Sequence, residues 1–179
     1  NTPANVCKQM LLDVGISSSR IDTAKFEEWH IYCVDNSLYC NIVIDSSLTL
    51  KKWLDTVSIL GRASIVQFGS MFSPVIDKAD TIPTQCFTFG MGNILKDSYS
   101  ETYLPIKDRA NALEVTYYDA TNNYDRTVFE VSNSGYDAAY EVNKQSVNLV
   151  GCTNRAMAIK YANYQLKTNR YLTLSAEWD

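Results

Sequence analysis

The stretch NLVGCTNRAMAIKYANYQLKTNRYLTLSAEWD (148–179) decides the expected fold. After a short β-prone run, Thr153 offers a hydroxyl that can accept hydrogen bonds from the free N–H groups of a helix's first turn. The helix is expected to pack through a slim face made of Ala156, Ile159, Ala162, Asn163 and Leu166. Alternation typical of a half-buried strand follows at Leu172, Leu174, Ala176 and Trp178. The stretch therefore predicts a strand, a helix lying close to a sheet, and a second strand.

The residues at the start of the chain are predicted to be mainly helical. A short helix is expected over Asn5–Asp13, and Gly15 can end it. A second helix is expected to begin at Ser19 or Asp22. Its buried stripe follows helical spacing at Phe26, Trp29, His30, Cys33 and Val34.

The next two segments differ in their periodicity. YCNIVID (39–45) is rich in β-branched residues and predicts a short strand. SSLTLKKWLDTVSILG (46–61) predicts a helix that Ser47 or Thr49 caps and that Gly61 ends in a left-handed conformation. Its buried face comprises Leu50, Trp53, Leu54, Val57 and Leu60.

A β-hairpin and a polar connection follow. Gly69-Ser70 lies between two apolar segments in 63–76, which predicts a two-residue type II′ turn because glycine tolerates a positive φ. Pro74 places the second strand at a sheet edge. The polar run DKADTIP (77–83) predicts a boundary between a helix-rich α/β subregion, 1–78, and a β-rich subregion, 79–179. A single compact domain is the alternative.

The later part of the chain is predicted to consist of strands. Two β-rich runs, 112–119 and 125–132, are separated by ATNNY and predict a hairpin, and 143–151 predicts a further strand. Because helices come first and antiparallel strands later, the fold class is α+β, with antiparallel sheets or a partial barrel and packed helices.

Composition and charge argue against two classes of partner. The chain of 179 residues has 16 basic and 20 acidic side chains, a net charge of −4, and no basic run. Nucleic acids and anionic membrane surfaces are bound largely through basic side chains, so recognition of either is not expected. No apolar run approaches the ~20 residues needed to span a bilayer, so membrane insertion is not expected. Because the chain begins without methionine or a signal-peptide pattern, we expect a piece of a larger protein.

Candidate nucleophiles are few. His30 is the only histidine and lies on a predicted apolar stripe, which favours a structural role; a Cys–His pair with Cys7 or Cys33 is the alternative. The cysteines show no CxxC spacing and are predicted to be buried free thiols: Cys7, Cys33, Cys40, Cys86 and Cys152.

Other motifs are also weak. GMGNIL (90–95) lacks the third glycine of a dinucleotide loop and predicts a turn, and GCTNRA (151–156) predicts helix capping rather than an anion site. The carboxylates that could form pairs are expected to be solvated: Glu27, Glu28, Asp77, Asp80, Asp119 and Asp125. No HExxH, GxSxG or calcium-loop pattern occurs. The sequence therefore predicts no catalytic residue, no cofactor and no metal site.

Tyrosine is abundant, with 12 in the chain. Several lie in VTYYDATNNYD and GYDAAYEV and suit either protein-interface anchors or strand residues with one solvated end. A carbohydrate-binding platform would also use tyrosines.

Two long stretches carry a resemblance to a known family. RANALEVTYYDATNNYDRTVFEV (109–131) and VNLVGCTNRAMAIKYANYQLKTNRYLTLSAEWD (147–179) are similar to tail-tip (host-specificity, or tip attachment) proteins of lambda-like bacteriophages. In that family "vevtwnDpxNxY" precedes "GCTsRgqAhrxgrwxLyTexxxxxxtfxxxlD". The matching residues are Asp119, Asn122 or Asn123, Tyr124, Gly151, Cys152, Thr153, Arg155, Ala158, Leu166, Thr168 and Asp179. Upstream, 23–33 and 39–80 match in the same order, so the similarity covers nearly the whole chain.

The resemblance implies a hub-region segment of a phage or prophage tail tip. Such hubs are trimers of small β-barrels and α/β inserts under the tail tube, and receptor-reading regions lie far downstream. The implied function is structural, in tail assembly and host attachment, with other tail proteins as partners and the virion tail as location after synthesis in the bacterial cytoplasm. Tyr117-Tyr118 and 157–161 depart from the pattern, which affects packing. No catalytic residue carries over. A host-surface binding module, or a wall-degrading enzyme using His30, is the alternative.

Overall fold

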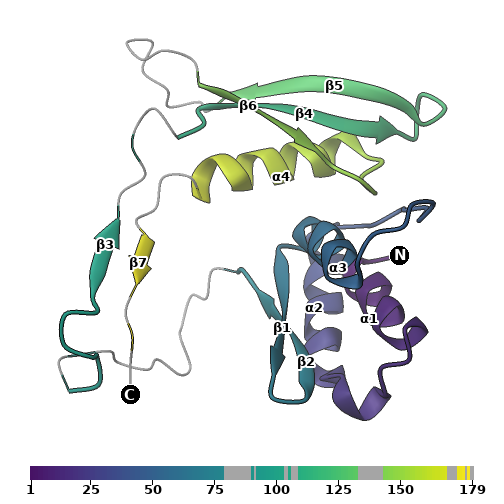
Figure 1. The fold of residues 1–179 in the computed structure, drawn as a ribbon. Coiled ribbons are helices and arrows are strands. Elements are labelled where there is room, and N and C mark those ends of the chain that lie inside the picture. Colours follow the sequence, from purple (N-terminus) through teal and green to yellow (C-terminus); the bar gives the residue numbers. More distant parts are fainter. Residues whose placement is uncertain are drawn as a thin grey trace.

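The computed structural model in Figure 1 describes residues 1–78, 90, 92–102, 105, 109–132, 143–168, 173–175 and 177. The elements in chain order are α1 (Pro3–Asp13), η1 (Ser18–Arg20), α2 (Thr23–Asp35), α3 (Leu50–Ser58), η2 (Ile59–Gly61), β1 (Ala63–Phe68), β2 (Met71–Ile76), β3 (Ser100–Thr102), β4 (Ala112–Asp119), β5 (Asp125–Ser132), β6 (Lys144–Asn148), α4 (Arg155–Thr168) and β7 (Thr173–Ser175). The predicted α+β class is confirmed. Within these residues the strands form three separate sheets and no closed barrel.

The first two helices begin at capping side chains. The hydroxyl of Thr2 accepts from the backbone N–H of Asn5 at 3.4 Å, and proline suits the first position of α1. The carboxylate of Asp22 accepts from the backbone N–H of Lys25 at 3.1 Å, so Asp22 begins α2. Ser19, the alternative start, lies in η1. Gly15, with φ at +86°, follows the end of α1 as predicted.

The buried face of α2 differs from the prediction at one end. Phe26, Trp29 and Cys33 are buried as expected. Val34 was predicted to join them, but 45% of its surface is exposed. Each residue turns about 100° around a helix, so Val34, one position after Cys33, faces away from the elements that α2 packs against.

The predicted strand over 39–45 is wrong. No described strand pairs with this segment, which runs extended between α2 and α3. Its beginning is held by two hydrogen bonds, in which the backbone N–H groups of Cys40 and Asn41 donate to the carbonyl oxygens of Asn1 and Gly151. β-branched residues favour a strand only where a neighbouring strand completes the ladder.

The predicted helix over 46–61 is shorter in the structure. The hydroxyl of Thr49 caps α3, accepting from the backbone N–H of Lys52, and Ser47 does not. Gly61 was predicted to adopt the left-handed conformation that ends the helix, but Arg62 adopts it, with φ at 53°. Gly61 instead lies against Trp29, whose indole Nε1 donates to the Gly61 carbonyl oxygen at 2.8 Å.

Gly61 is therefore required for close packing. A Cβ at this position would lie 2.8 Å from the Trp29 ring. We expect Gly61→Ala to lower the free energy of unfolding by about 1–3 kcal/mol, because a fully buried indole has no room to move. Urea denaturation measures the change. Gly92→Ala is the control, since nothing lies within 4 Å of a Cβ there; equal losses in the two variants would contradict the packing argument.

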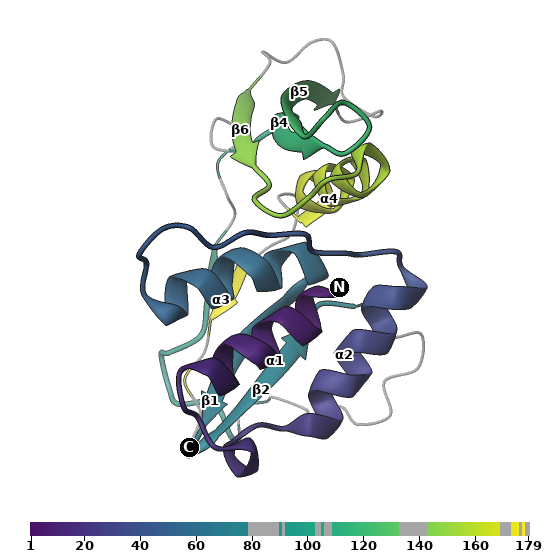
Figure 2. The same ribbon diagram turned by 90° about the vertical axis from the view of Figure 1, so that its right-hand side faces the viewer.

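The first hairpin follows the prediction. Phe68 pairs with Met71 across a two-residue turn, and φ is positive at Gly69 (+59°) but not at Ser70, which identifies a type II′ turn. Pro74 lies opposite Ile65 in this two-stranded sheet. Figure 2 shows that α1, α2 and α3 cover one face of the hairpin; α2 contacts β2, and α3 contacts β1.

The larger sheet has the strand order β5-β4-β6. The bounds of β4 and β5 equal the predicted ones, 112–119 and 125–132, and the pair is antiparallel. β6 is shorter than the predicted strand over 143–151 and runs parallel to β4, with Val115 opposite Val147. The expectation that the later strands are antiparallel therefore fails for β6, because the chain returns to the opposite edge of β4 in the same direction.

Helix α4 lies along the β5-β4-β6 sheet (Figure 1). Its buried residues are Met157, Ala158, Tyr161, Ala162 and Leu166. Ala162 and Leu166 were predicted correctly, but Ala156, Ile159 and Asn163 are exposed. The real contact face is rotated toward the large side chains of Met157 and Tyr161, while Ala158 and Ala162 allow close approach.

The last predicted strand is present as β7, which pairs with β3 (Ser100 with Ser175). The predicted alternation of its side chains lies outside the residues whose side chains are described. The polar connection over 79–83 also lies outside them, so the division into 1–78 and 79–179 stays a prediction. Among the described residues, no helix has the length and apolar character needed to cross a membrane.

One group of buried residues runs through the helices and the larger sheet. It includes Trp29, Leu60, Tyr117, Leu149 and Ala162. Polar contacts join the same elements at the surface. The Nζ of Lys160 donates to the Asn36 carbonyl oxygen at 2.8 Å, and the Arg62 guanidinium lies 4.8 Å from the centre of the Tyr164 ring. Helix α4 is thereby fixed to the helical part of the chain.

Candidate interaction site

A groove of about 1190 Å³ lies where the first residues of the chain meet the β4–β5 turn. Its walls come from α1, the extended segment 40–45, the β4–β5 turn and residues 150–153. These four segments are distant in sequence, so the groove forms only in the folded chain.

The extended wall of the groove is anchored at one end. The backbone N–H of Asn41 donates to the Gly151 carbonyl oxygen at 2.9 Å, and its side-chain amide donates to the hydroxyl of Thr153 at 2.9 Å. Thr153, predicted to cap α4, therefore holds this wall instead. Asn154 is the cap, because its side-chain oxygen accepts from the backbone N–H groups of Ala156 at 2.8 Å and Met157 at 3.3 Å.

Beyond this anchor the wall is apolar and solvated. Val43 has 84% of its surface exposed, and Ile44 is also exposed. No strand in the described residues pairs with this β-branched run. Exposed single apolar residues are ordinary, but a run of them lining a concave surface is typical of a binding site.

The opposite wall is built by the turn between β4 and β5. The carboxylate of Asp119 accepts from the Thr121 hydroxyl at 2.7 Å, the Thr121 backbone N–H at 2.9 Å and the Tyr117 hydroxyl at 2.8 Å. These bonds lower the pKa of the Asp119 carboxyl, with Thr121 contributing most. Burial and the hydrogen bond to Asp119 raise the pKa of Tyr117 to about 12. Asp119 therefore acts as a turn-forming residue.

The turn ends in a strained and exposed tyrosine. Asn123 and Tyr124 adopt left-handed conformations, with φ at 50° and 60°. A bulky side chain seldom does so, and such strain costs of order 1–3 kcal/mol and gathers at functional sites. The side chain of Tyr124 is 62% exposed and lines the groove together with Tyr118. The left-handed residue Tyr124 thus contributes an exposed aromatic ring to the lining of the groove.

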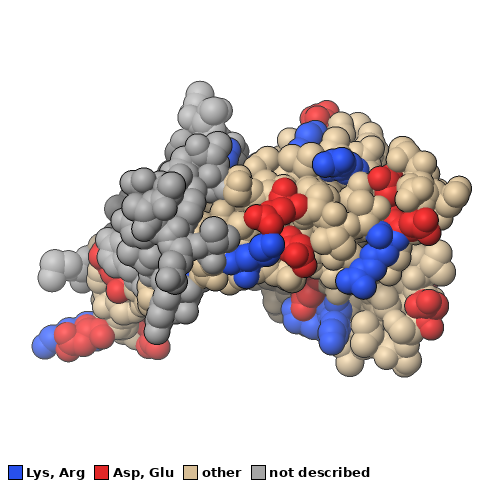
Figure 3. Space-filling view, turned by 90° about the horizontal axis from the view of Figure 1, so that it is seen from above, with Lys and Arg blue, Asp and Glu red and all other residues tan. Residues whose placement is uncertain are grey.

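The groove has an acidic edge. Asp13 and Asp45 line it, and the described lining includes no lysine or arginine. Elsewhere the charges alternate, as Figure 3 shows for one face, where basic and acidic side chains lie beside one another. The groove thus combines apolar side chains with uncharged polar ones and two carboxylates.

His30, Cys7 and Cys33, the candidate nucleophiles, are not among the residues that line the groove. His30 is half-buried, and its Nδ1 lies 2.8 Å from the Thr2 hydroxyl oxygen. Cys7 and Cys33 are fully buried, and burial raises the pKa of both thiols, that of Cys33 to about 12. A thiol needs to ionise to act as a nucleophile, so neither is activated here.

The other cysteines also behave as core residues. Cys40 and Cys152 are free and buried, as predicted for all five cysteines. Burial raises the pKa of Cys40 to about 11. Cys86 lies outside the described residues. Among the described residues, no three histidine, cysteine or carboxylate side chains gather in a way that could hold a metal ion.

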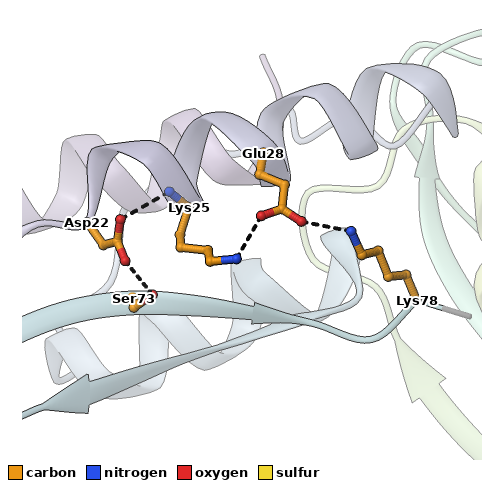
Figure 4. A network of polar contacts seen from close by, with 5 residues as sticks. All are labelled: Asp22, Lys25, Glu28, Ser73 and Lys78. Atoms are coloured by element: carbon orange, nitrogen blue, oxygen red, sulfur yellow. Dashed lines mark hydrogen bonds and ion pairs between the residues drawn. The ribbon is translucent and has the colours of Figure 1, made fainter. Parts of the chain in front are cut away.

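The predicted surface carboxylates lie in polar networks at the surface. Glu28 pairs with Lys78 at 2.7 Å and Lys25 at 2.9 Å, and these bonds lower its pKa, Lys78 contributing most. Asp22 accepts from the Ser73 hydroxyl at 3.2 Å, so the network in Figure 4 ties α2 to β2.

The remaining predicted groups lie apart from one another. Asp77 accepts a hydrogen bond from the Tyr164 hydroxyl, Glu27 and Asp125 are exposed, and Asp80 lies outside the described residues. GMGNIL forms a turn at its described residues, where Asn93 and Ile94 both donate to the Gly90 carbonyl oxygen.

Sequence reasoning missed the groove itself. Its exposed residues Val43, Ile44, Tyr118 and Tyr124 fall in segments that were predicted as a strand, a strand end and a hairpin loop. The available signals were the β-branched run over 39–45 and the tyrosines around Asp119. Neither indicates that the two segments meet.

Comparisons with known proteins identify the family of the chain. Residues 72–179 match the family described as "Putative phage tail protein". The chain is 26% identical over 130 residues, 73% of its length, to the tip attachment protein J of Escherichia phage SECphi27. The match spans 11% of that relative. Because the family match includes the β4–β5 hairpin, β6 and α4, the chain belongs to this family of phage tail proteins.

Proposed function

We propose that the chain is a structural component of a phage or prophage tail tip, acting in tail assembly and host attachment through protein–protein contacts. The observation that carries this proposal is the groove, where Val43 is 84% exposed and a strained Tyr124 faces solvent. Aromatic and apolar side chains in a concave, polar-rimmed surface are typical of protein interfaces. The relative that the chain resembles is named as a tip attachment protein.

The partners are copies of the same protein, in a trimeric hub of the whole protein, and other tail proteins. The location is the virion tail after synthesis in the bacterial cytoplasm. The function is not enzymatic. The protonated thiols of Cys7 and Cys33, and the hydrogen bond between His30 and Thr2, support that view.

Deletion of the coding sequence for residues 1–179 from the phage that encodes it tests the proposal. We expect particles without functional tails, counted by electron microscopy and by plating efficiency. A tagged protein should be found at the tail tip by immunogold labelling. His30→Ala is the control and should give normal tails and normal plating. Normal tails after the deletion would contradict the proposed function, and lost wall-clearing activity in a folded His30→Ala variant would contradict the non-enzymatic role.

A second candidate function is direct binding of a host-surface glycan. Tyr118 and Tyr124 both line the groove and are both exposed, and aromatic rings supply rigid apolar faces with a polar end. Glycan-array binding by the chain, lost in Tyr124→Ala, would support this candidate over passive assembly.

A further inference from the structure

We propose that the groove receives the β1–β2 hairpin tip of a second copy of this chain, so that copies assemble head to tail. This inference rests on the proposed structural function and names the surface that it uses. The hairpin tip consists of Phe68, Gly69, Ser70 and Met71.

The hairpin tip has the form of an apolar projection. Phe68 is 67% exposed and Met71 is also exposed, and the two face each other across a two-residue turn. The two-residue turn keeps the projection narrow. A large exposed phenylalanine at such a tip is costly to leave in water, because burying a side chain of this size is worth about 1.5–3 kcal/mol.

A positive charge is fixed beside this tip. The Nε of Arg20 donates to the Ser70 carbonyl oxygen at 2.9 Å, and its guanidinium lies 5.8 Å from the centre of the Phe72 ring. The two contacts hold the cation at the turn before any partner binds, which reduces the entropy lost on binding.

The groove offers the complementary surface. Val43, Ile44 and Tyr124 supply apolar area, and Asp13 and Asp45 supply negative charge. An apolar tip with one cation therefore meets a partly apolar groove with two carboxylates. Complementary charge of this kind fixes the orientation of partners and speeds their association.

The size of the groove favours a polypeptide occupant. Its volume, about 1190 Å³, lies above the range of about 300–1000 Å³ that small-molecule pockets span. Its lining also includes 40–45, an extended segment that no described strand pairs with.

The tip and the groove lie on separate parts of the molecule. Figures 1 and 2 both show the β1–β2 turn at the end of the helical part that is remote from the start of α1. The groove is lined by residues along α1 from Asn5 to Asp13, and none of the four hairpin-tip residues lines it. One chain therefore presents both surfaces at once, and contacts between copies are head to tail. Such contacts close into a ring if the rotation between copies allows it, which agrees with the proposed trimer.

Two complementary variants test this arrangement. Val43→Asp damages the groove but leaves the tip intact, and Phe68→Asp does the reverse. Both residues are exposed, so both variants should fold, which circular dichroism and urea denaturation verify. Analytical ultracentrifugation should find oligomers of the wild-type chain and monomers of each variant alone. An equimolar mixture of the two should form a dimer that grows no further, because only one intact tip and one intact groove can meet.

The controls separate this contact from other associations. Val128→Asp changes an exposed valine on β5, away from both surfaces, and should associate as the wild type does. Arg20→Glu should weaken association at least tenfold, and adding Asp45→Lys in the same chain should restore part of it. A monomeric wild-type chain at every concentration, or a mixture that stays monomeric, would overturn the proposal.

Failure of this contact differs from failure of the proposed function. If Val43→Asp and Phe68→Asp phages build normal tails while the deletion of 1–179 abolishes them, the head-to-tail contact is wrong and the structural function stands. If the deletion leaves tails intact, the function itself is wrong.

Discussion

Replacing Trp29 by alanine is expected to lower the free energy of unfolding by about 3–5 kcal/mol. Trp29 has none of its surface exposed, and its ring lies 6.0 Å from that of Phe26. Removal of the indole leaves a cavity between α2 and η2. It also removes the donor to the buried Gly61 carbonyl oxygen, now bonded at 2.8 Å. Urea denaturation followed by circular dichroism measures the loss.

Trp53→Ala is the matched control for this variant. Trp53 carries the same side chain on α3 but is only half-buried. Less apolar area of Trp53 is removed from water on folding. Trp53→Ala should therefore lower the free energy of unfolding by much less than Trp29→Ala does. Similar destabilisation by the two substitutions would show that Trp29 is not the centre of the helical core.

Replacing Gly151 by alanine is expected to lower the free energy of unfolding by about 2–4 kcal/mol, from backbone strain and overpacking together. The φ of Gly151 is +90°, which L-residues seldom adopt. An added Cβ would lie 3.1 Å from the Cys40 Sγ and 3.4 Å from the Ile42 Cβ. Both neighbours belong to the extended wall of the groove, so the substitution should also weaken association in the ultracentrifuge.

Gly15→Ala separates the two causes. Gly15 has a similar φ, +86°, but nothing lies within 4 Å of a Cβ placed there. It should therefore show only the backbone cost, about 1–2 kcal/mol, and leave association unchanged. If Gly15→Ala destabilised the chain as much as Gly151→Ala, crowding at Cys40 and Ile42 would not be the reason for glycine at 151.

The elements that the sequence predicted well depend on local physics. The helices begin at side chains that can cap them, such as Asp22 and Thr49, within three residues of the N–H groups they satisfy. The turn at Gly69-Ser70 needs a positive φ that glycine supplies on its own. The strands over 112–119 and 125–132 were delimited correctly because polar turn residues separate two β-rich runs.

The sequence-based predictions that were wrong failed because of contacts between residues that are distant in the chain. Thr153 can cap a helix, but the side-chain amide of Asn41, more than a hundred residues away in the chain, donates to its hydroxyl instead. Gly61 can end a helix, but the space that a side chain would need there is filled by Trp29. The buried face of α4 was placed by small residues, whereas the sheet packs on Met157 and Tyr161 as well.

In the candidate site, too, the sequence predicts the local segments but not how they pack together. From the sequence alone, 39–45 could be recognised as a β-branched run and Asp119–Tyr124 as a hairpin turn, and the family resemblance could be inferred from collinear motifs. Their meeting across a groove could not, because it depends on how α1, 40–45 and the β4–β5 turn pack together.

The sequence by itself determined where helices begin and where the two hairpins turn, because capping, turn geometry and periodicity act over a few neighbouring residues. The family was inferred from the resemblance of collinear motifs. The tertiary structure alone decided that 39–45 pairs with no described strand, that the Trp29 indole packs against Gly61 and that Thr153 anchors the groove wall. Those outcomes depend on which distant groups compete for the same space and the same hydrogen bonds.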